Sequence, residues 1–341
     1  MKKLISIFTF FFALLCFAAC QKTDTKLLEE KSEYIIVHLG MSGDLQTKGI
    51  ATNNLYGINV YYDPERDGNS NTHYAYGLFD NKEDMSITLL SGYTYKFECT
   101  LVKDGKTMLY CGQYGGNSFS GYAKPFQTNS SASTQLSNSF VYGTTYLSGI
   151  TSGEATVKSI STGYVNQTMP SLQRYYGEIE GYTPVVGGTV VIPLKKTVFA
   201  ARFIIYKVPE GQLTTECVID SSSEILFSGL ATNKLYDSGA ILYSYPDVRA
   251  CWLNEPTIPT TVNWEYTSSV FSQWNQSGVK DVTFKRNKLT TITISCVPDN
   301  ASGGISLQEE TFGEDNNIYL YLNSDGVIVV GVDPNEEGGD D

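Results

Sequence analysis

The chain has 341 residues, a formal net charge of -12 at pH 7, and an aromatic fraction of 13% that includes 24 tyrosines. So acidic a chain repels phosphate backbones, which argues against nucleic acid as a partner. About 300 residues remain after a leader and a short tether, which is more than one ordinary hydrophobic core and predicts two domains.

The first twenty residues have the pattern of an export signal. Lys2 and Lys3 precede a short apolar run, Leu4–Leu15, and Ala18-Ala19-Cys20 follows it. This order predicts a secretory signal peptide over residues 1–20, because the run is too short to span a membrane comfortably. Ala18-Ala19-Cys20 resembles the lipobox of bacterial lipoproteins, in which the cysteine is lipidated and becomes the mature N-terminus. An ordinary signal peptide with an incidental cysteine is the alternative.

Alternation of apolar and polar residues dominates the rest of the chain, and helical periodicity is scarce. Residues 21–33 are polar and predict a flexible tether. Tyr93–Leu101 alternates throughout, which predicts a strand with its aromatic residues on one face. Further strands are expected at 34–39, 58–62, 87–90, 190–194, 198–208, 224–227, 282–284, 290–297, 318–322 and 327–332. This pattern predicts an all-β protein of the sandwich type.

A strand-like stretch runs almost continuously from Gly187 to Val208 and contains the expected domain boundary. We therefore predict an N-terminal domain over 34–195, a C-terminal domain over 196–332 and an acidic tail over 333–341. The span 115–168 is rich in Gly, Ser, Thr and Asn, which is typical of loops and also of a ligand or partner surface carried on loops. A short helix or turn is expected near 168–176.

Five cysteines remain when Cys16 leaves with the leader and Cys20 takes the lipid: Cys99, Cys111, Cys217, Cys251 and Cys296. Their number is odd and their spacings match no zinc template. Asp104-Gly105 is a hairpin-turn signal, which predicts a partner strand at 108–111 and brings the first two cysteines onto neighbouring strands. A disulfide between them and five buried free thiols are both compatible with the sequence.

Motifs for catalysis are absent from the sequence. The two histidines, His38 and His73, are far apart, and no serine-hydrolase, zinc-protease or phosphate-loop pattern occurs. Asp63–Asn69 lacks the closing glutamate of a calcium-binding loop and is interpreted as a turn. The carboxylate pairs Glu178/Glu180 and Glu309/Glu310 have little specificity in an acidic chain. We expect no enzyme, no cofactor and no metal site.

Three tryptophans, Trp252, Trp264 and Trp274, lie within a short segment that is also rich in Pro and Asn. Aromatic side chains on loops can stack on the face of a sugar. The alternative is that they are core and edge residues of the second sandwich.

Two parts of the chain carry a more specific pattern. The first is Ile36–Gly40, then Gln46–Gly49, then Asn54–Asp63; the second is Val190–Phe203 followed by Val282–Ile294. Together they resemble the fimbrillin-like lipoproteins of Bacteroidales. Those chains open with a strand, a Thr-Lys-Ala-type element and a second strand that ends in an aromatic-Asp pair, although Gly49 stands here in place of the usual alanine.

The resemblance implies two tandem transthyretin-like β-sandwich domains. In the family, a protease removes the N-terminal strand, and a strand from the next subunit fills the exposed groove. That strand would be Tyr34–Met41 here, and the donor would be the last strands, 318–332. Family processing often follows an arginine, but none precedes Arg66, so a cut would follow Lys48 or another residue.

The function expected from these observations is a structural and adhesive component of a cell-surface fimbria, without catalysis. Its partners would be other fimbrial subunits, the outer membrane through the lipid on Cys20, and a host protein or glycan receptor. Shaft, anchor and tip roles all remain open, and so does a permanently tethered chain. The alternative is a surface lipoprotein that binds a glycan or another ligand through loops and aromatic residues.

Overall fold

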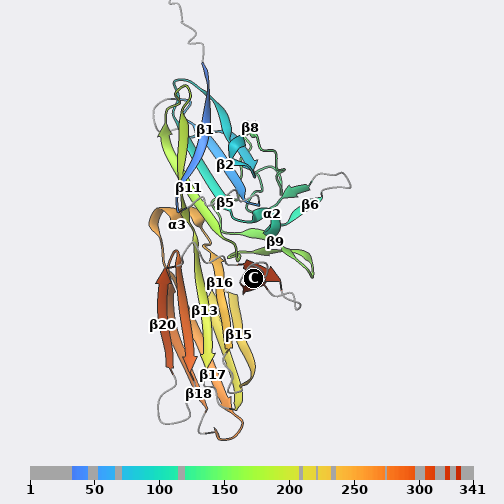
Figure 1. Cartoon of the computed structure of the whole chain (residues 1–341), viewed down its shortest axis with the longest axis vertical. Helices are drawn as coiled ribbons and strands as arrows, with labels where there is room; N and C mark the ends of the chain where they lie inside the picture. Colours follow the sequence, from blue (N-terminus) through green and yellow to red (C-terminus); the bar gives the residue numbers. More distant parts are fainter. Residues whose placement is uncertain are drawn as a thin grey trace, which may run out of the picture.

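A computed structural model of the chain describes residues 33–44, 53–65, 71–113, 120–206, 210–219, 222–231, 236–272, 275–295, 304–311, 319–322 and 328–331. Strands make up nearly all of the regular structure in these ranges, which confirms the all-β prediction. The molecule is elongated, with the N-terminal half and the C-terminal half placed end to end (Figure 1). None of the helices in the described ranges is long and apolar enough to span a membrane.

An eight-stranded sheet forms the N-terminal half, in the order β4-β1-β12-β11-β5-β2-β3-β8. Its strands are β1 (Tyr34–Gly43), β2 (Leu55–Tyr62), β3 (Thr72–Phe79), β4 (Ser86–Leu90), β5 (Tyr95–Val102), β8 (Phe140–Tyr142), β11 (Arg174–Tyr182) and β12 (Thr189–Lys196). The sheet curls until its two ends meet. The backbone N–H of Thr88 on β4 donates to the hydroxyl of Tyr142 on β8 at 3.1 Å, and the hydroxyl of Tyr74 on β3 donates to the Thr88 carbonyl at 2.9 Å. The curl encloses an apolar core that includes Val37, Phe97 and Ile192.

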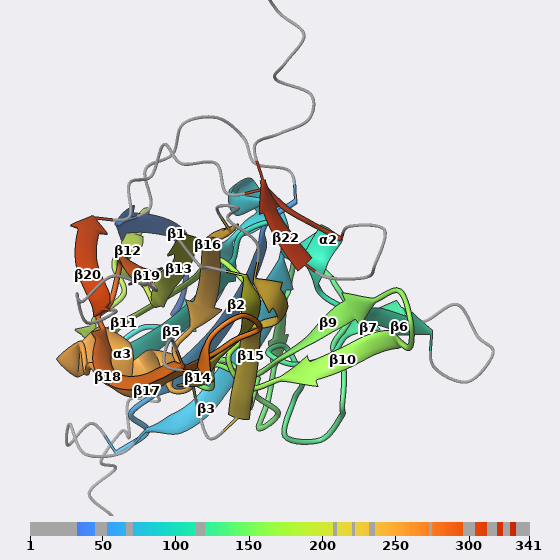
Figure 2. The ribbon, with the colours of Figure 1, turned by 90° about the horizontal axis from the view of Figure 1, so that it is seen from below.

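Two short ribbons project from the side of this half (Figure 2). One is β6 (Cys111–Gln113) with β7 (Ser120–Tyr122), and the other is β9 (Ala155–Ser159) with β10 (Gly163–Gln167). A second core lies beneath them and includes Leu55, Phe126 and Leu147. The short helices of this half are the 3-10 helix η1 (Lys82–Asp84) and α2 (Gly105–Met108).

Two four-stranded sheets form a sandwich in the C-terminal half. One has the order β16-β13-β19-β20 and the other β15-β14-β17-β18. The strands are β13 (Val198–Tyr206), β14 (Gly211–Ile219), β15 (Ser222–Ala231), β16 (Tyr236–Ser244), β17 (Ile258–Ser268), β18 (Gln276–Phe284), β19 (Lys288–Ser295) and β20 (Gly304–Thr311), with α3 (Val248–Asn254) between β16 and β17. Alternate residues of both sheets, such as Phe203 and Val262, fill the core between them.

Only Thr197 separates β12 of the first half from β13 of the second. Its backbone N–H and its hydroxyl both contact the Arg174 carbonyl, at 2.8 and 3.2 Å, and its carbonyl accepts from the Tyr245 N–H at 3.0 Å. The strands before this residue belong to the eight-stranded sheet and those after it to the two four-stranded sheets. The domain limits and the transthyretin-like description of each half stay predictions.

Several local expectations are wrong. Gly105–Met108 is a helical turn that follows Asp104 in the left-handed region (φ 54°), and not a hairpin turn. The reason is that β5 already pairs with β2 on one side and β11 on the other, which leaves it no free edge. Cys111 pairs instead with Tyr122 of β7. The expected helix or turn near 168–176 is a series of bends that leads into β11.

Phe199 on β13 is fully buried, and its ring lies 4.8 Å from Phe284 and 5.3 Å from Tyr243 in stacked geometry. We expect Phe199→Ala to lower the free energy of unfolding by about 3–5 kcal/mol, through lost burial and the cavity left behind. Val279→Ala, at an exposed position of β18, should change it by less than about 0.5 kcal/mol. Urea denaturation measures both, and equal effects would contradict the assignment of this core.

Candidate functional site

The first strand, β1, has one face in the core and one face in solvent. Ile35, Val37 and Leu39 are buried among the residues of the N-terminal core, whereas Tyr34 and Ile36 are 70% and 60% exposed. This alternation follows from the two-residue period of a strand. The prediction of a strand at 34–39 is confirmed, and β1 continues to Gly43.

The two halves of β1 pair with different neighbours. From Tyr34 to His38 it is antiparallel to β4, and from His38 to Gly43 it is parallel to β12. Within the described residues β4 pairs with no strand other than β1. Among the described residues the N-terminal strand is therefore the only strand that joins β4 to the sheet by backbone pairing, although side-chain hydroxyls of Tyr74, Tyr95 and Tyr142 also contact β4.

A polar clamp holds the end of β1 against the C-terminal half. The Asp44 carboxylate accepts from the backbone N–H of Lys196 at 3.0 Å and from the Arg286 guanidinium at 2.9 Å. Arg286 lies after β18 and also contacts Glu255, at 3.2 Å. Burial acts to lower the pKa of Arg286, but its contacts with Glu255 and Asp44 outweigh that effect and hold the pKa above its usual range. The residue that directly follows β1 is thus bound at the joint between the two halves.

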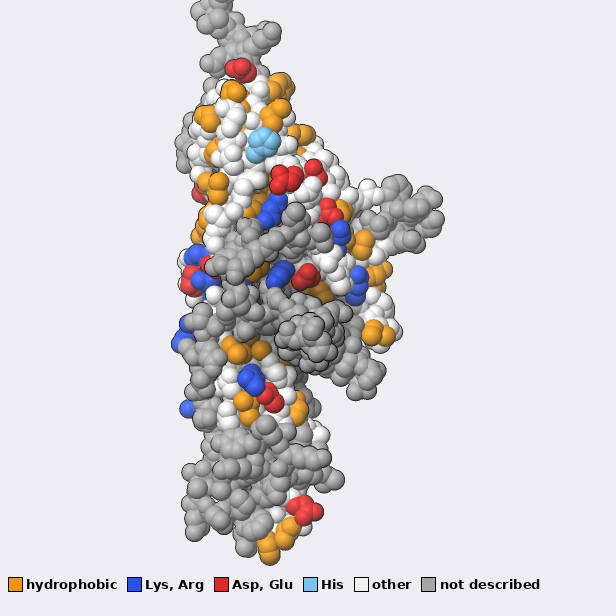
Figure 3. Space-filling model, in the orientation of Figure 1, with side chains coloured by type: hydrophobic (Ala, Val, Ile, Leu, Met, Phe, Trp, Pro, Cys, Tyr) orange, Lys and Arg blue, Asp and Glu red, His pale blue; other side chains and the backbone are white. Residues whose placement is uncertain are grey.

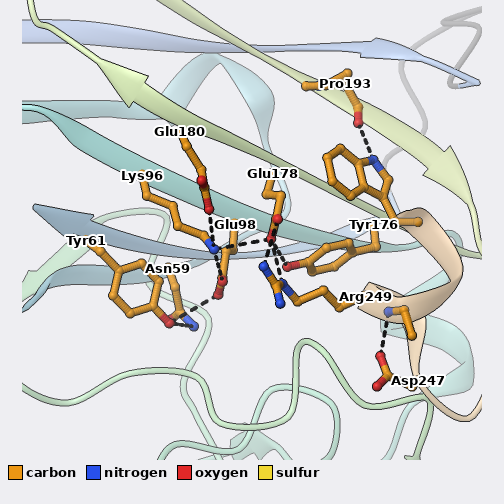
Figure 4. A network of polar contacts seen from close by, with 12 residues as sticks. Asn59, Tyr61, Lys96, Glu98, Tyr176, Glu178, Glu180, Pro193, Asp247 and Arg249 are labelled. Atoms are coloured by element: carbon orange, nitrogen blue, oxygen red, sulfur yellow. Dashed lines mark hydrogen bonds and ion pairs between the residues drawn. The ribbon is translucent and has the colours of Figure 1, made fainter. Parts of the chain in front are cut away.

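A second polar network crosses the same joint (Figure 4). Glu178 of β11 lies directly opposite Glu98 of β5. Lys96 lies between the two carboxylates, at 3.2 Å from Glu98 and 3.4 Å from Glu178. Arg249 of α3 donates two hydrogen bonds to Glu178, at 2.9 and 3.0 Å, and so attaches the C-terminal half to β11.

The chemistry of this network is structural. Burial would raise the pKa of Glu178, but the hydrogen bond from Arg249 and the charge of Lys96 outweigh it and leave the pKa below its usual range. The Tyr176 hydroxyl also donates to Glu178, at 3.0 Å, and the Tyr61 hydroxyl donates to Glu98 at 3.1 Å. Glu178 is thus an ionised and buried partner of two cations, which is the opposite of the raised pKa that a general acid requires.

The three tryptophans considered as sugar-stacking residues differ in their surroundings. Trp252 lies on α3, where its indole N–H donates to the Pro193 carbonyl at 3.2 Å. Its ring lies edge-on to that of Tyr176, with the ring centroids 6.3 Å apart. Trp264 lies on β17 in the C-terminal core and is 6% exposed, so it presents no open face to a sugar. Trp274 lies outside the described residues.

The remaining predicted residues are placed as follows. Cys99, Cys111, Cys217 and Cys251 are free thiols in the structure, which does not support the Cys99–Cys111 disulfide. His73 contacts the Gly143 carbonyl at 2.7 Å, and His38 is exposed on β1. Among the described residues no group of His, Cys, Asp and Glu could hold a metal ion. Cys20, Lys48 and Cys296 lie outside the described residues.

The last strands form a small hairpin of β21 (Tyr319–Leu322) and β22 (Ile328–Gly331). Within the described residues these two strands pair only with each other, and β22 lies beside β16 (Figure 1). The strands of the predicted donor segment therefore belong neither to the eight-stranded sheet nor to the C-terminal sandwich.

Sequence reasoning missed the Asp44–Arg286 clamp and the role of Arg249. Their partners are 242 and 71 residues away along the chain, so no local spacing reveals them. The one signal present was the pair Lys96 and Glu98 on the alternating strand, whose charges must find partners on a neighbouring strand.

No family model and no curated protein sequence matches the chain. Three solved structures illustrate what its fold is similar to. A fimbrial assembly protein from Parabacteroides distasonis is 13% identical, over 88% of this chain and 99% of that one, with a TM-score of 0.35. The fimbrial anchor protein Mfa2 from Porphyromonas gingivalis is 8% identical, over 88% and 100%, also at 0.35. The tip fimbrial protein Mfa3 from the same organism is 10% identical, over 81% and 99%, at 0.29.

The Arg249–Glu178 pair yields a pH-dependent prediction. The pKa of Glu178 is lowered in the folded state, so the pair stabilises the fold fully above the unfolded value of 4.5 and less as the pH falls through the folded pKa. We expect Arg249→Met to cost about 1–2 kcal/mol at pH 7, since Arg249 is partly exposed, and the difference from wild type to shrink below about pH 4.

Thermal unfolding between pH 7 and pH 3.5 measures this difference. Lys280→Met removes an exposed cation from β18 and serves as the control, with little change at any pH. A deficit of Arg249→Met that stays constant across this range would refute the role of the ion pair.

Proposed function

We propose that this chain is a structural and adhesive subunit of a cell-surface fimbria, and that it assembles by exchange of its N-terminal strand. The observation that carries the proposal is the position of β1: its three inward side chains close the N-terminal core, and among the described residues it is the only strand that pairs with β4. A strand in that position can be replaced by a strand from another chain without any change elsewhere in the topology.

Withdrawal of β1 would have a large physical cost. Ile35, Val37 and Leu39 would leave the core, at roughly 1.5–3 kcal/mol for each side chain. β4 and the first part of β12 would both lose their hydrogen-bonded neighbour. An open apolar groove with unpaired strand edges is unstable. An incoming strand would cover the groove and pair with these edges, and the free energy gained would drive assembly.

The donor in this proposal is the C-terminal segment that contains β21 and β22. Its sequence is apolar at Tyr319–Leu322 and Ile328–Val330, and its strands pair only with each other among the described residues. Opened into one extended strand, the segment from Tyr319 to Gly331 is longer than the 10 residues of β1, which span about 33 Å. It can therefore cover the whole groove of a neighbouring subunit.

Release of β1 requires a cut between β1 and β2, in the segment that contains Lys48. After such a cut the strand is held only by its pairing, its three buried side chains and the Asp44 clamp. The same cut would separate the body from the lipid on Cys20. Lipidation would therefore keep the subunit at the outer membrane until assembly begins, and an uncut chain would remain there as an anchor.

Strand exchange is tested with the body from residue 21 onward, carrying a specific protease site in place of Gln46–Gly49. After cleavage we expect a ladder of polymers on size-exclusion chromatography and on gels without boiling. A synthetic peptide of residues 33–44 should suppress the ladder, because it refills the groove, whereas the same peptide with Val37→Asp should not. A cut body that loses β1 and stays monomeric would rule out this mode of assembly.

The lipid anchor is tested separately by Cys20→Ala in the full chain. We expect the variant to lose incorporation of a labelled fatty acid and to leave the membrane fraction, since its tether then has no acyl chain. Cys16→Ala should behave as wild type because that residue leaves with the leader. Membrane retention of Cys20→Ala with an unchanged acyl label would show that the anchor is elsewhere.

A further inference from the structure

A cavity of about 360 Å³ lies on the side of the N-terminal half, where the two projecting ribbons meet. The backbone N–H of Tyr110 donates to the Thr156 carbonyl at 2.9 Å, and the N–H of Thr156 donates to the Lys124 carbonyl at 3.0 Å. These bonds attach the segment before β6 and the segment after β7 to β9. The cavity therefore has walls held by backbone hydrogen bonds, and its volume lies in the range of about 300–1,000 Å³ found for small-ligand sites.

One wall is aromatic. The ring centroids of Tyr110 and Tyr164 lie 4.7 Å apart at an angle of 35°, so the two rings pack against each other. Tyr164, on the outer ribbon, is 48% exposed. Neither phenolic hydroxyl has a hydrogen-bond partner within the described part of the chain, so both are available to a ligand.

Polar groups lie beside the aromatic wall, because Asn166 and Tyr164 share one face of β10. The hydroxyl of Thr156, a buried residue, donates to the Oδ1 atom of Asn166 at 2.7 Å. This bond occupies one acceptor site of the carboxamide and leaves its NH₂ group as a free donor among the described residues. Gln127 adds a second carboxamide to the lining, and it likewise has no partner there. The one cation of the lining, Lys124, is paired with Glu154.

The floor is bare backbone. Gly112 of β6 pairs directly with Gly121 of β7. A Cβ atom on Gly112 would lie 2.8 Å from the Tyr110 ring, and one on Gly121 would lie 2.8 Å from the Ser133 hydroxyl. Paired glycines weaken a ribbon, and a common reason for them is close approach of another group to the backbone. Because Gly112 has no side chain, the Tyr110 ring can lie close to the backbone of β6.

We propose that this cavity binds a neutral sugar residue of a glycan. Tyrosine rings match the apolar face of a pyranose, and free carboxamides and hydroxyls match its hydroxyl groups. The paired Lys124 leaves no free positive charge for an acidic sugar or a phosphate, and the net charge of -12 opposes both. Figure 3 shows hydrophobic and charged side chains close together on the side where the ribbons project. The site is distinct from the groove of β1 and does not depend on strand exchange.

The test uses the full mature chain on a printed array of neutral, sialylated and sulfated glycans. The strongest neutral hit is followed by titration calorimetry with the methyl glycoside of its terminal sugar. We expect Tyr164→Ala and Asn166→Ala each to weaken binding about tenfold or more, and Tyr164→Phe to retain most of it because the ring face is kept.

The matched control is Val165→Ala, which lies between the two tested residues on β10 and points to the other face of the strand. It should bind as wild type does. The proposal is overturned if no neutral glycan binds, if only acidic glycans bind, or if Tyr164→Ala and Asn166→Ala bind as well as Val165→Ala. Circular dichroism of all four variants establishes that the exposed substitutions leave the fold intact.

Discussion

The N-terminal half depends on a single strand that pairs with different neighbours along its length. β1 is antiparallel to β4 over its first residues and parallel to β12 over its last, and it contributes Ile35, Val37 and Leu39 to the core. A strand in the middle of a sheet is normally held by its chain connections and by hydrogen bonds to a neighbouring strand along each of its two edges. Here the first described strand closes the core, and the proposed assembly depends on its removal.

The joint between the two halves is polar and contains several ion pairs among the described residues. Arg249 binds Glu178 across it, and Arg286 binds both Asp44 and Glu255. Removal of one partner from such a pair costs more than the pair itself contributes, because the other charge remains poorly solvated. The Asp44 contact has a further consequence, since it couples the end of β1 to the C-terminal half and makes retention of the strand sensitive to how the halves are joined.

The sequence predicted best where alternation was strong and least where partners are distant. Strands such as β1, β5, β13 and β19 were expected within a few residues of their observed limits, because one face of each is buried. β17 was not predicted, although Val262, Trp264 and Tyr266 alternate on its buried face. The Pro and Asn residues of this segment favoured an interpretation as loops, and its tryptophans an interpretation as sugar-binding residues. The short helix at Gly105–Met108 replaced an expected hairpin, since the pairing of β5 with β2 and β11 is a property of the whole sheet. The Tyr110–Tyr164 wall was not predicted either, because two ribbons separated in the chain must meet to form it.

The central claim, that β1 leaves its place during assembly, is tested most directly by locking the strand. His38 and Thr189 are paired in register on β1 and β12, and both are exposed, so His38→Cys with Thr189→Cys can join them by a disulfide. Polymer formation by the cut body is then measured with and without a reductant. The account predicts monomers when the disulfide is intact and polymers when it is reduced. Equal polymerisation in the two states would contradict the claim that β1 must be displaced.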